Sequence, residues 1–475
     1  MAGVSLSLGK LNGFAQKSLN RRDFLEKSGT GLGLIALAPL LRGAESKRSG
    51  GLTHHPARAK RVIHLFMHGG PSHMDLWDPK PELSRRAGQP LPESFGEVMT
   101  RRQVANNPLL APVRPFSRHG QSGLEISDFL PEMSKLADHF CVLRSCHGDS
   151  VNHPQSVYQM NTGSILMGRP SVGAWVSYGL GSENESLPAY VVLPDPRGGS
   201  KGGPPAWGSG FLPAAHQGVT MRPGSTPLLN LKPPPERESR QRATLDLIQD
   251  LNRSHLEARD FDDELSARIA SYEMAFRMQT EAPELVDLAS ESEATKKLYG
   301  MDDPVTREFG TRCLLARRMI ERGVRFVQLY SGDTNGWDAH KDVLQNHGEY
   351  CAATDRPVAG LLRDLESRGL LEDTLVIWGG EFGRMPMSEQ GTGRDHNPWG
   401  YSIVLAGGGV KGGHVHGATD EFGLRATESP VHIHDLHATI LHLLGFDHER
   451  LTFPHNGLDA RLTGVSGKVV HNILA

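Results

Sequence analysis

Short apolar runs alternate with longer amphipathic stretches along this chain of 475 residues. The runs are as long as the buried strands of a parallel sheet. They predict strands at residues 61–67, 190–193, 324–329, 374–378 and 401–406. Stretches with helical spacing lie between them, including residues 312–322 and 357–368. This alternation is typical of an α/β fold, in which helices cover both faces of a mainly parallel central sheet.

One long segment interrupts the alternation. Residues 181–235 are rich in glycine and proline and predict an elaborate loop region. A charged stretch follows at 236–280, and its apolar residues, such as Leu245 and Leu251, have helical spacing. We expect residues 181–280 to be an insertion of loop and helix that caps one end of the sheet, within one domain that spans residues 46–475.

The first residues have the layout of an export signal. Arg21 and Arg22 precede an apolar pair, and residues 29–41 form an uncharged run of moderate hydrophobicity. This predicts a twin-arginine signal over residues 1–45, cleaved near Ala44. The alternative is an amphipathic helix with a chance arginine pair. No other apolar run approaches the roughly 18 residues of a membrane helix. We therefore expect an exported mature chain, periplasmic or extracellular, without a transmembrane segment.

Charge and cysteine content narrow the range of partners. A formal net charge of −3 gives no electrostatic basis for binding nucleic acid or an anionic membrane. The cysteines are too few for a disulfide framework and lack the spacing of a zinc ribbon. We expect buried free thiols at Cys141, Cys146, Cys313 and Cys351.

The 23 histidines carry the clearest chemical signal, because His is the commonest transition-metal ligand. The first cluster offers His68, His73 and Asp75 directly after the first predicted strand. Three more clusters lie at residues 146–154, at 333–340, and at 378–384 leading into 393–399. In open α/β sheets, ligands bind beyond the carboxyl ends of the strands, which is where these clusters fall. The set indicates a metal site; the alternative is that polar, glycine-rich loops simply collect His, Asp and Asn.

Other histidines give a weaker signal. They are His414, His416, His432, His434 and His437. Residues 434–444 have the apolar spacing of an amphipathic helix. The imidazoles of that helix line a groove or face water, and we do not count them as ligands.

Five segments together resemble a known bacterial family. They are residues 64–78, 336–340, 378–384, 394–400 and 435–445. Their order and content are similar to the family called domain of unknown function 1501, which is grouped with the alkaline phosphatase and sulfatase superfamily. The resemblance covers nearly the whole chain after residue 45, and it implies an alkaline phosphatase-like fold for residues 46–475.

The resemblance also implies metal ligands. Residues 374–383 are similar to the sulfatase strand that ends in Ser-Asp-His-Gly, so Glu381 takes the place of a metal-binding Asp and Phe382 that of the following His. His68 stands where the first metal-binding Asp would be. Asp338, His340 and His396 resemble the ligands of the other metal position. Together with the first strand-end cluster, this makes the candidate metal ligands His68, Asp75, Asp338, His340, Glu381 and His396.

No standard nucleophile matches the family pattern. Sulfatases use Cys or Ser in a Cys-x-Pro-x-Arg motif, and phosphatases use Ser or Thr. The comparable stretch here, residues 152–156, reads Asn-His-Pro-Gln-Ser. His153 is a candidate to ligate metal or attack phosphorus, whereas Ser150 or Ser156 would serve only if the loop is threaded differently.

The function expected from these features is metal-dependent hydrolysis of phosphate or sulfate esters. A divalent ion (Zn, Mn or Ca) would activate water directly, and Arg384 or Arg394 would hold the anionic group of the substrate. The expected partner is a small anionic ester or a sulfated or phosphorylated polymer. The alternative is a catalytically silent binding or scaffold protein that keeps this fold but lost its nucleophile.

Overall fold

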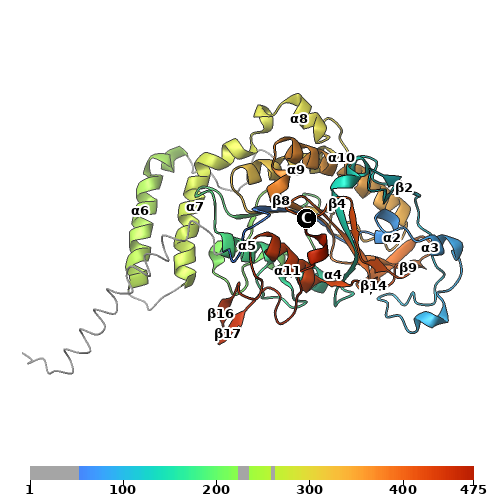
Figure 1. The fold of residues 1–475 in the computed structure, drawn as a ribbon. Coiled ribbons are helices and arrows are strands. Elements are labelled where there is room, and N and C mark those ends of the chain that lie inside the picture. The colour runs from blue at the N-terminus through green and yellow to red at the C-terminus, as the bar shows by residue number, and fades with distance from the viewer. Residues whose placement is uncertain (1–52, 223–234, 258–262) are drawn as a thin grey trace, which may run out of the picture. The chain divides into compact units, whose positions relative to one another are not determined.

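The computed structural model describes residues 53–222, 235–257 and 263–475 (Figure 1). The predicted twin-arginine segment lies outside the described residues, so export remains a prediction. No helix in the described part of the chain is long and apolar enough to cross a membrane.

A nine-stranded sheet forms the centre of the described chain, in the order β12-β4-β11-β8-β1-β7-β5-β6, with β15 also paired to β4. Its strands are β1 (Arg61–Met67), β4 (Phe140–His147), β5 (Tyr190–Leu193), β6 (Val219–Thr220), β7 (Phe326–Ser331), β8 (Thr374–Gly379), β11 (Tyr401–Ala406), β12 (His414–His416) and β15 (Val431–His432). Only β11 runs antiparallel, against β4 and β8. The expected α/β fold with a mainly parallel sheet is confirmed.

Helices cover both faces of this sheet (Figure 1). Side chains of β1 alternate between the two faces: Ile63 and Leu65 enter one core, and Val62 and Phe66 enter the other. The first core includes α9 (Arg307–Glu321) and α10 (Val343–Ser367). The second includes α4 (His153–Thr162), α5 (Val172–Leu180) and α11 (Ile433–Leu443).

One strand and one helix extend beyond the boundaries that the sequence predicts. Strand β7 continues to Ser331 because Tyr330 and Ser331 are also buried in the sheet. Helix α10 begins at Val343, well before the predicted start at Pro357, because Val343, Tyr350 and Cys351 continue its buried stripe upstream.

The remaining elements surround the sheet. Within the predicted helical stretch 236–280, the structure has α6 (Pro235–Glu257) and α7 (Asp263–Val286), whereas residues 258–262 lie outside the described residues. Helix α7 buries Met278 and Leu285 in the first core. Whether this segment caps the sheet stays a prediction. The shorter elements are α2 (His73–Leu76), α3 (Pro81–Arg85), β2 (Phe116–His119), β3 (Leu124–Ser127), α8 (Glu293–Leu298), β9 (Gly383–Glu389), β10 (Gly393–Asn397), β13 (Ala418–Thr419), β14 (Ala426–Glu428), β16 (Phe453–His455) and β17 (Leu458–Ala460).

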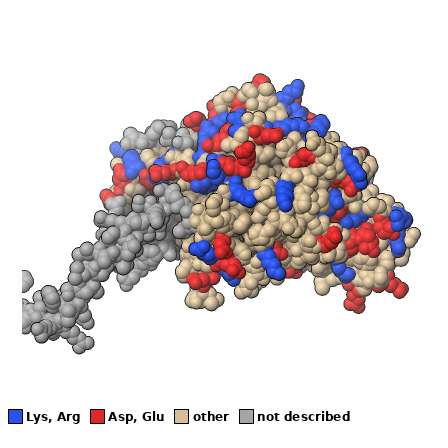
Figure 2. Space-filling model, viewed as in Figure 1, with Lys and Arg blue, Asp and Glu red and all other residues tan. Residues whose placement is uncertain are grey.

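The cysteines and the surface charges can also be compared with what the composition predicts. All four cysteines are free and buried, as predicted. On the face shown in Figure 2, basic and acidic side chains are interspersed over the described surface.

Candidate metal centre

The candidate centre lies beyond the carboxyl ends of parallel strands. Strands β7 and β8 both pair with β1 in parallel, so the loops that follow all three leave from one edge of the sheet. These loops carry His68, Asp338 and Glu381. Strand β4 leads to the same region, where His153 begins α4, and the β9–β10 hairpin brings in His396.

Two glycines let the loops after β1 and β7 pack closely. Gly69 has a φ of +108°, and a Cβ there would lie 2.6 Å from the backbone nitrogen of Asp338. Gly336 has a φ of +58°, and a Cβ there would lie 2.1 Å from the carbonyl oxygen of His68. Only glycine fits such a close approach of two backbones. This contact, with the hydrogen bond from Trp337 N to His68 O (2.8 Å), fixes the position of Asp338.

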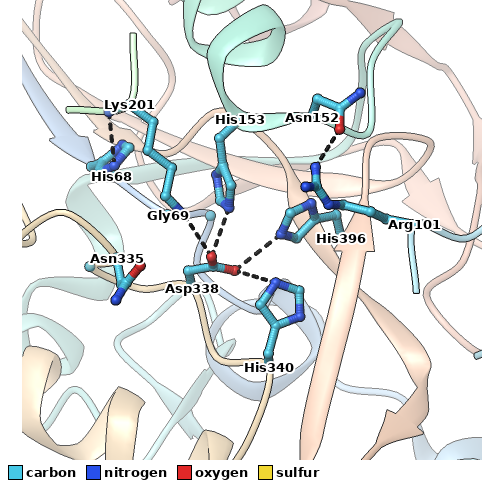
Figure 3. A network of polar contacts seen from close by, with 12 residues as sticks. His68, Gly69, Arg101, Asn152, His153, Lys201, Asn335, Asp338, His340 and His396 are labelled. Atoms are coloured by element: carbon cyan, nitrogen blue, oxygen red, sulfur yellow. Dashed lines mark hydrogen bonds and ion pairs between the residues drawn. The ribbon is translucent and has the colours of Figure 1, made fainter. Parts of the chain in front are cut away.

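Three imidazoles converge on the Asp338 carboxylate (Figure 3). Nε2 of His153 lies 2.9 Å from Oδ2, and Nε2 of His340 and Nε2 of His396 lie 3.0 and 3.1 Å from Oδ1. One ligand atom from each of the four residues falls within 4.8 Å of the others. The structure therefore brings together Asp338, His340 and His396 from the predicted ligand set, and places beside them His153, which was predicted either to ligate metal or to attack phosphorus.

The other ring nitrogen of each histidine has a fixed acceptor. Nδ1 of His153 lies 2.7 Å from Glu381 Oε1, and Nδ1 of His340 lies 2.6 Å from Glu389 Oε2. Nδ1 of His396 lies 2.6 Å from the carbonyl oxygen of Val151. Carboxylate and carbonyl oxygens accept, so Nδ1 carries the proton in all three rings. Histidines that ligate metals are oriented in this way, through a carboxylate or carbonyl behind the ring.

Whether a metal ion fits among these four side chains depends on which of their atoms carry a proton. A neutral ring with its proton on Nδ1 presents a lone pair at Nε2, and a carboxylate also only accepts, so each of these rings that is neutral would face Asp338 as acceptor against acceptor. Nε2 of His153 makes no hydrogen bond although it lies 2.9 Å from Asp338. A cation between these atoms would turn mutual repulsion into coordination. A set of three imidazoles and one carboxylate suits a divalent transition metal such as zinc.

The pKa values of His396 and Asp338 are both lowered, which favours a neutral imidazole and an ionised carboxylate. Burial lowers the pKa of His396 well below its usual value, so this ring is neutral near pH 7. Burial alone would raise the pKa of Asp338, yet the Arg384 guanidinium beside it holds that pKa well below its usual range. The centre thus offers an ionised carboxylate with at least one neutral imidazole.

Glu381 lies behind His153 rather than beside the converging atoms. Its two oxygens accept from the backbone N–H of Gly69 (3.0 and 3.1 Å), and Oε1 also contacts His153. Burial would raise its pKa, but His68 and His153 lower it to about 2. His68, also outside the four-residue cluster, has its Nδ1 3.7 Å from Glu381 Oε1, and that buried nitrogen has no hydrogen-bond partner. The arrangement is that of a carboxylate that orients a ligand.

Asp75 and Arg394 lie outside the cluster and bind each other. Arg394 donates from Nε to Asp75 Oδ2 (2.8 Å), and its other nitrogens donate to backbone carbonyls, including those of Leu110 and Ala111. Both side chains are fully buried. The carboxylate oxygens of Asp75 accept hydrogen bonds from Arg394, from the hydroxyl of Ser72 and from the backbone N–H of Val113. In this structure the pair joins two parts of the fold, and neither residue reaches the centre.

Arg384 and Ser150 also have protein partners. Arg384 is fully buried, lies 2.8 Å from Asp338 Oδ1, and donates to the carbonyls of Gly69 and Gly70. It therefore positions Asp338 and is shielded from an incoming substrate. The hydroxyl of Ser150 accepts from the backbone N–H of Asn152 in the loop before α4.

A polar cavity of about 450 Å³ opens onto the centre. Its lining includes four basic side chains, Arg101, Arg102, Lys201 and Lys341. Lys201 donates from Nζ to Asp338 Oδ2 (2.7 Å), as Figure 3 shows. Sequence reasoning did not find these residues or Glu389. They occupy loops and a strand end without a recognisable motif, and only the fold brings them together.

The sequence comparison decides the family. The family model described as "Protein of unknown function (DUF1501)" matches residues 59–474. The chain belongs to this family. The resemblance predicted from five short segments is thereby confirmed for this DUF1501 protein. No curated protein matches its sequence.

Several solved structures are similar to this DUF1501 protein. A sulfatase from Pseudoalteromonas sp. has 13% identity and a TM-score of 0.35, over 87% of this chain and 71% of that one. Lipoteichoic acid synthase from Listeria monocytogenes has 10% identity and a TM-score of 0.36, over 88% and 79%. Alkaline phosphatase from the Antarctic bacterium TAB5 has 9% identity and a TM-score of 0.33, over 81% and 98%. At these identities the similarity concerns the fold alone.

Proposed function

We propose that this protein is an exported, metal-dependent hydrolase of phosphate or sulfate esters. One observation carries the proposal: three imidazole Nε2 atoms, each with its Nδ1 proton directed to an acceptor behind the ring, converge on the Asp338 carboxylate. His153, His340, His396 and Asp338 would hold the ion. A divalent ion bound there would polarise the ester and lower the pKa of a water molecule, which supplies the nucleophile.

The surrounding residues prepare the site for this chemistry. Glu381 and Glu389 fix the orientation of His153 and His340, and Arg384 fixes Asp338. Lys201 places a cation beside the same carboxylate, where it would stabilise the negative charge on the reacting group. The basic cavity lining suits an anionic substrate.

Direct attack by water agrees with the composition of the cavity. None of its described lining residues is Ser, Thr or Cys. The reaction would break the bond between the central phosphorus or sulfur and the ester oxygen, and release an alcohol and the inorganic anion. In this proposal His153 acts as a ligand rather than as the attacking group, because both of its ring nitrogens face carboxylates.

The test is turnover of aryl phosphates and aryl sulfates by the full chain. Protein stripped with a chelator would be assayed alone and after addition of Zn²⁺, Mn²⁺ or Ca²⁺. We expect activity only with metal, and its loss in a variant that carries both His396→Ala and Glu381→Gln. If that variant keeps both metal and activity, the proposal fails. Stoichiometric metal without turnover of any ester would instead favour a silent binding protein.

Export is a separate part of the proposal and needs its own test. It is motivated by the Arg21-Arg22 pair and the uncharged run at residues 29–41. Replacing both arginines by lysine should retain the protein in the cytoplasm of a bacterial host, as measured by cell fractionation. Unchanged export of this variant would overturn the twin-arginine assignment.

A further inference from the structure

Every residue that lines the cavity above Asp338 has a polar or charged side chain. Its residues are Arg101, Arg102, His153, Lys201, Asn335, Asp338, His340, Lys341, Gln390 and His396. The volume of about 450 Å³ is in the range of small-molecule sites, about 300–1,000 Å³, but such sites are mostly lined by apolar and aromatic groups. A ligand of this cavity would therefore present hydroxyl or charged groups on all sides.

The cations of this lining outnumber the anions that could balance them. Asp338 is its one carboxylate, and Lys201 already pairs with it. Arg102 lies 3.4 Å from Glu389 Oε1 and has a partner there. Arg101 donates to the amide oxygen of Asn152, which is uncharged. Lys341 is exposed, and neither it nor Arg101 has a carboxylate partner among the described residues.

The two unbalanced cations lie close to the metal centre. Lys341 directly follows His340, and Figure 3 shows Arg101 directed toward Asn152, in the same cavity that His396 lines. The rings of His340 and His396 have their centroids 4.7 Å apart. Arg101 and Lys341 thus approach the cavity from two chain segments beside one pair of ligands.

The backbone beside these residues is held in an uncommon conformation. Gln103, Asp342 and Gln390 have φ values of 58°, 48° and 51°. Asp342 follows Lys341, Gln103 lies two residues after Arg101, and Gln390 itself lines the cavity. Non-glycine residues in this region cost about 1–3 kcal/mol each and cluster at functional sites. Their presence agrees with loops that are shaped to present the two cations.

We propose that Arg101 and Lys341 form a second anion subsite, and that the substrate carries a further anionic group apart from the ester that is cleaved. This inference rests on the proposed function, which places the cleaved ester at the Asp338 cluster. Lys201 would serve the reacting group, and the second subsite would hold the remainder of the substrate. The substrate class is therefore a polyhydroxylated compound with at least two phosphate or sulfate groups.

The test compares probes with one and two anionic groups. Dissociation constants of fructose 6-phosphate and fructose 1,6-bisphosphate would be measured by calorimetry with the Zn²⁺-loaded full chain at low salt. The wild-type chain should bind the bisphosphate at least about tenfold more tightly. A variant with Arg101→Gln and Lys341→Gln should lose about tenfold in bisphosphate affinity and less than twofold for the monophosphate. Arg118→Gln, an exposed cation on β2, is the matched control and should change neither value.

The outcomes separate this inference from the proposed function. If the double variant weakens both probes equally, or neither, the second subsite is wrong even where aryl esters are still hydrolysed. If no ester is hydrolysed but the bisphosphate preference depends on Arg101 and Lys341, the subsite stands and the hydrolase assignment falls. Raising the salt concentration should reduce the difference between the affinities for the bisphosphate and the monophosphate, because salt screens exposed charges.

Discussion

Nε2 of His396 lies 3.1 Å from Oδ1 of Asp338, while Nδ1 of the same ring donates to the carbonyl of Val151 at 2.6 Å. In the neutral ring that burial favours, two acceptors therefore face each other inside the protein. A buried arrangement of this kind is costly unless a cation lies between the two groups. Nε2 of His153 and Nε2 of His340 lie 2.9 and 3.0 Å from the same carboxylate, and this convergence of three rings on Asp338 is the physical basis for the metal centre.

Replacing the shared carboxylate should remove metal binding. Asp338→Asn leaves a similar shape but takes away the negative charge that three rings surround. We expect zinc affinity to fall by more than about 100-fold, beyond the usual effect of residues behind the ligands. A competition titration with a chromophoric chelator measures it. Asp128→Asn, at an exposed aspartate beside β3, is the control. Equal affinities of Asp338→Asn and the parent would contradict the site.

Glu389 should affect zinc binding through its contact with His340. Its carboxylate holds the Nδ1 proton of that ring at 2.6 Å, and Glu389→Gln weakens this acceptor while keeping the side-chain volume. We expect zinc affinity to fall by about 10–100-fold, with the fold unchanged by circular dichroism. Glu389→Asp should recover part of the affinity, because a carboxylate is restored. Zinc affinity that falls in Glu389→Asp but stays at the parent value in Glu389→Gln would show that side-chain length, and not the carboxylate, matters.

Glu381 should make the stability of the metal-free protein depend on pH. Its pKa is lowered from 4.5 to about 2 despite burial, through His68 and His153. A depressed pKa in the folded state stabilises above the unfolded value, and this contribution is lost as the pH falls from about 4.5 toward 2. Urea unfolding of the parent and of Glu381→Gln should therefore differ at neutral pH and converge in acid. A difference that is constant across this window would contradict the assigned shift.

The Asp75–Arg394 pair should contribute to folding rather than to binding. Both side chains are fully buried and joined at 2.8 Å, so removing one partner leaves an unpaired buried charge. Asp75→Asn or Arg394→Gln should each destabilise the chain by about 3–5 kcal/mol. The double variant should lose less than the sum of the two, as measured by urea unfolding. Zinc stoichiometry at low temperature should stay unchanged. Loss of zinc with stability intact would return Asp75 to the ligand set.

Much of the fold was predictable because its signals are local. The runs at residues 61–67 and 190–193 coincide with the parallel strands β1 and β5, and the run at 401–406 coincides with the antiparallel strand β11, since strands buried on both faces are continuously apolar. The common direction of the parallel strands β1, β7 and β8 places the residues that follow them at one edge of the sheet. Asp338, His340 and His396 were accordingly expected together, and the structure places them together.

The remaining features of the site depend on contacts that no local pattern reveals. Asp75 comes soon after β1, as His68 does, but it lies in helix α2 and pairs with Arg394, so the two residues are distinguished only by tertiary packing. Glu381 is near the site, yet the hydrogen bonds from Gly69 hold it behind His153. Lys201 and Arg101 come from loops whose sequence has no metal or anion motif, and their position became visible only with the cavity.

Zinc titration of the chelator-stripped full chain, followed by calorimetry, tests the central claim most directly. We expect one tightly bound ion per chain, and no tight binding by a variant with His153→Ala, His340→Ala and His396→Ala. A variant with His414→Ala, at a histidine outside the cluster, should bind like the parent. Absence of tight binding to the parent by Zn²⁺, Mn²⁺ and Ca²⁺ alike, or equal binding by the triple variant, would contradict the metal centre and with it the proposed hydrolase.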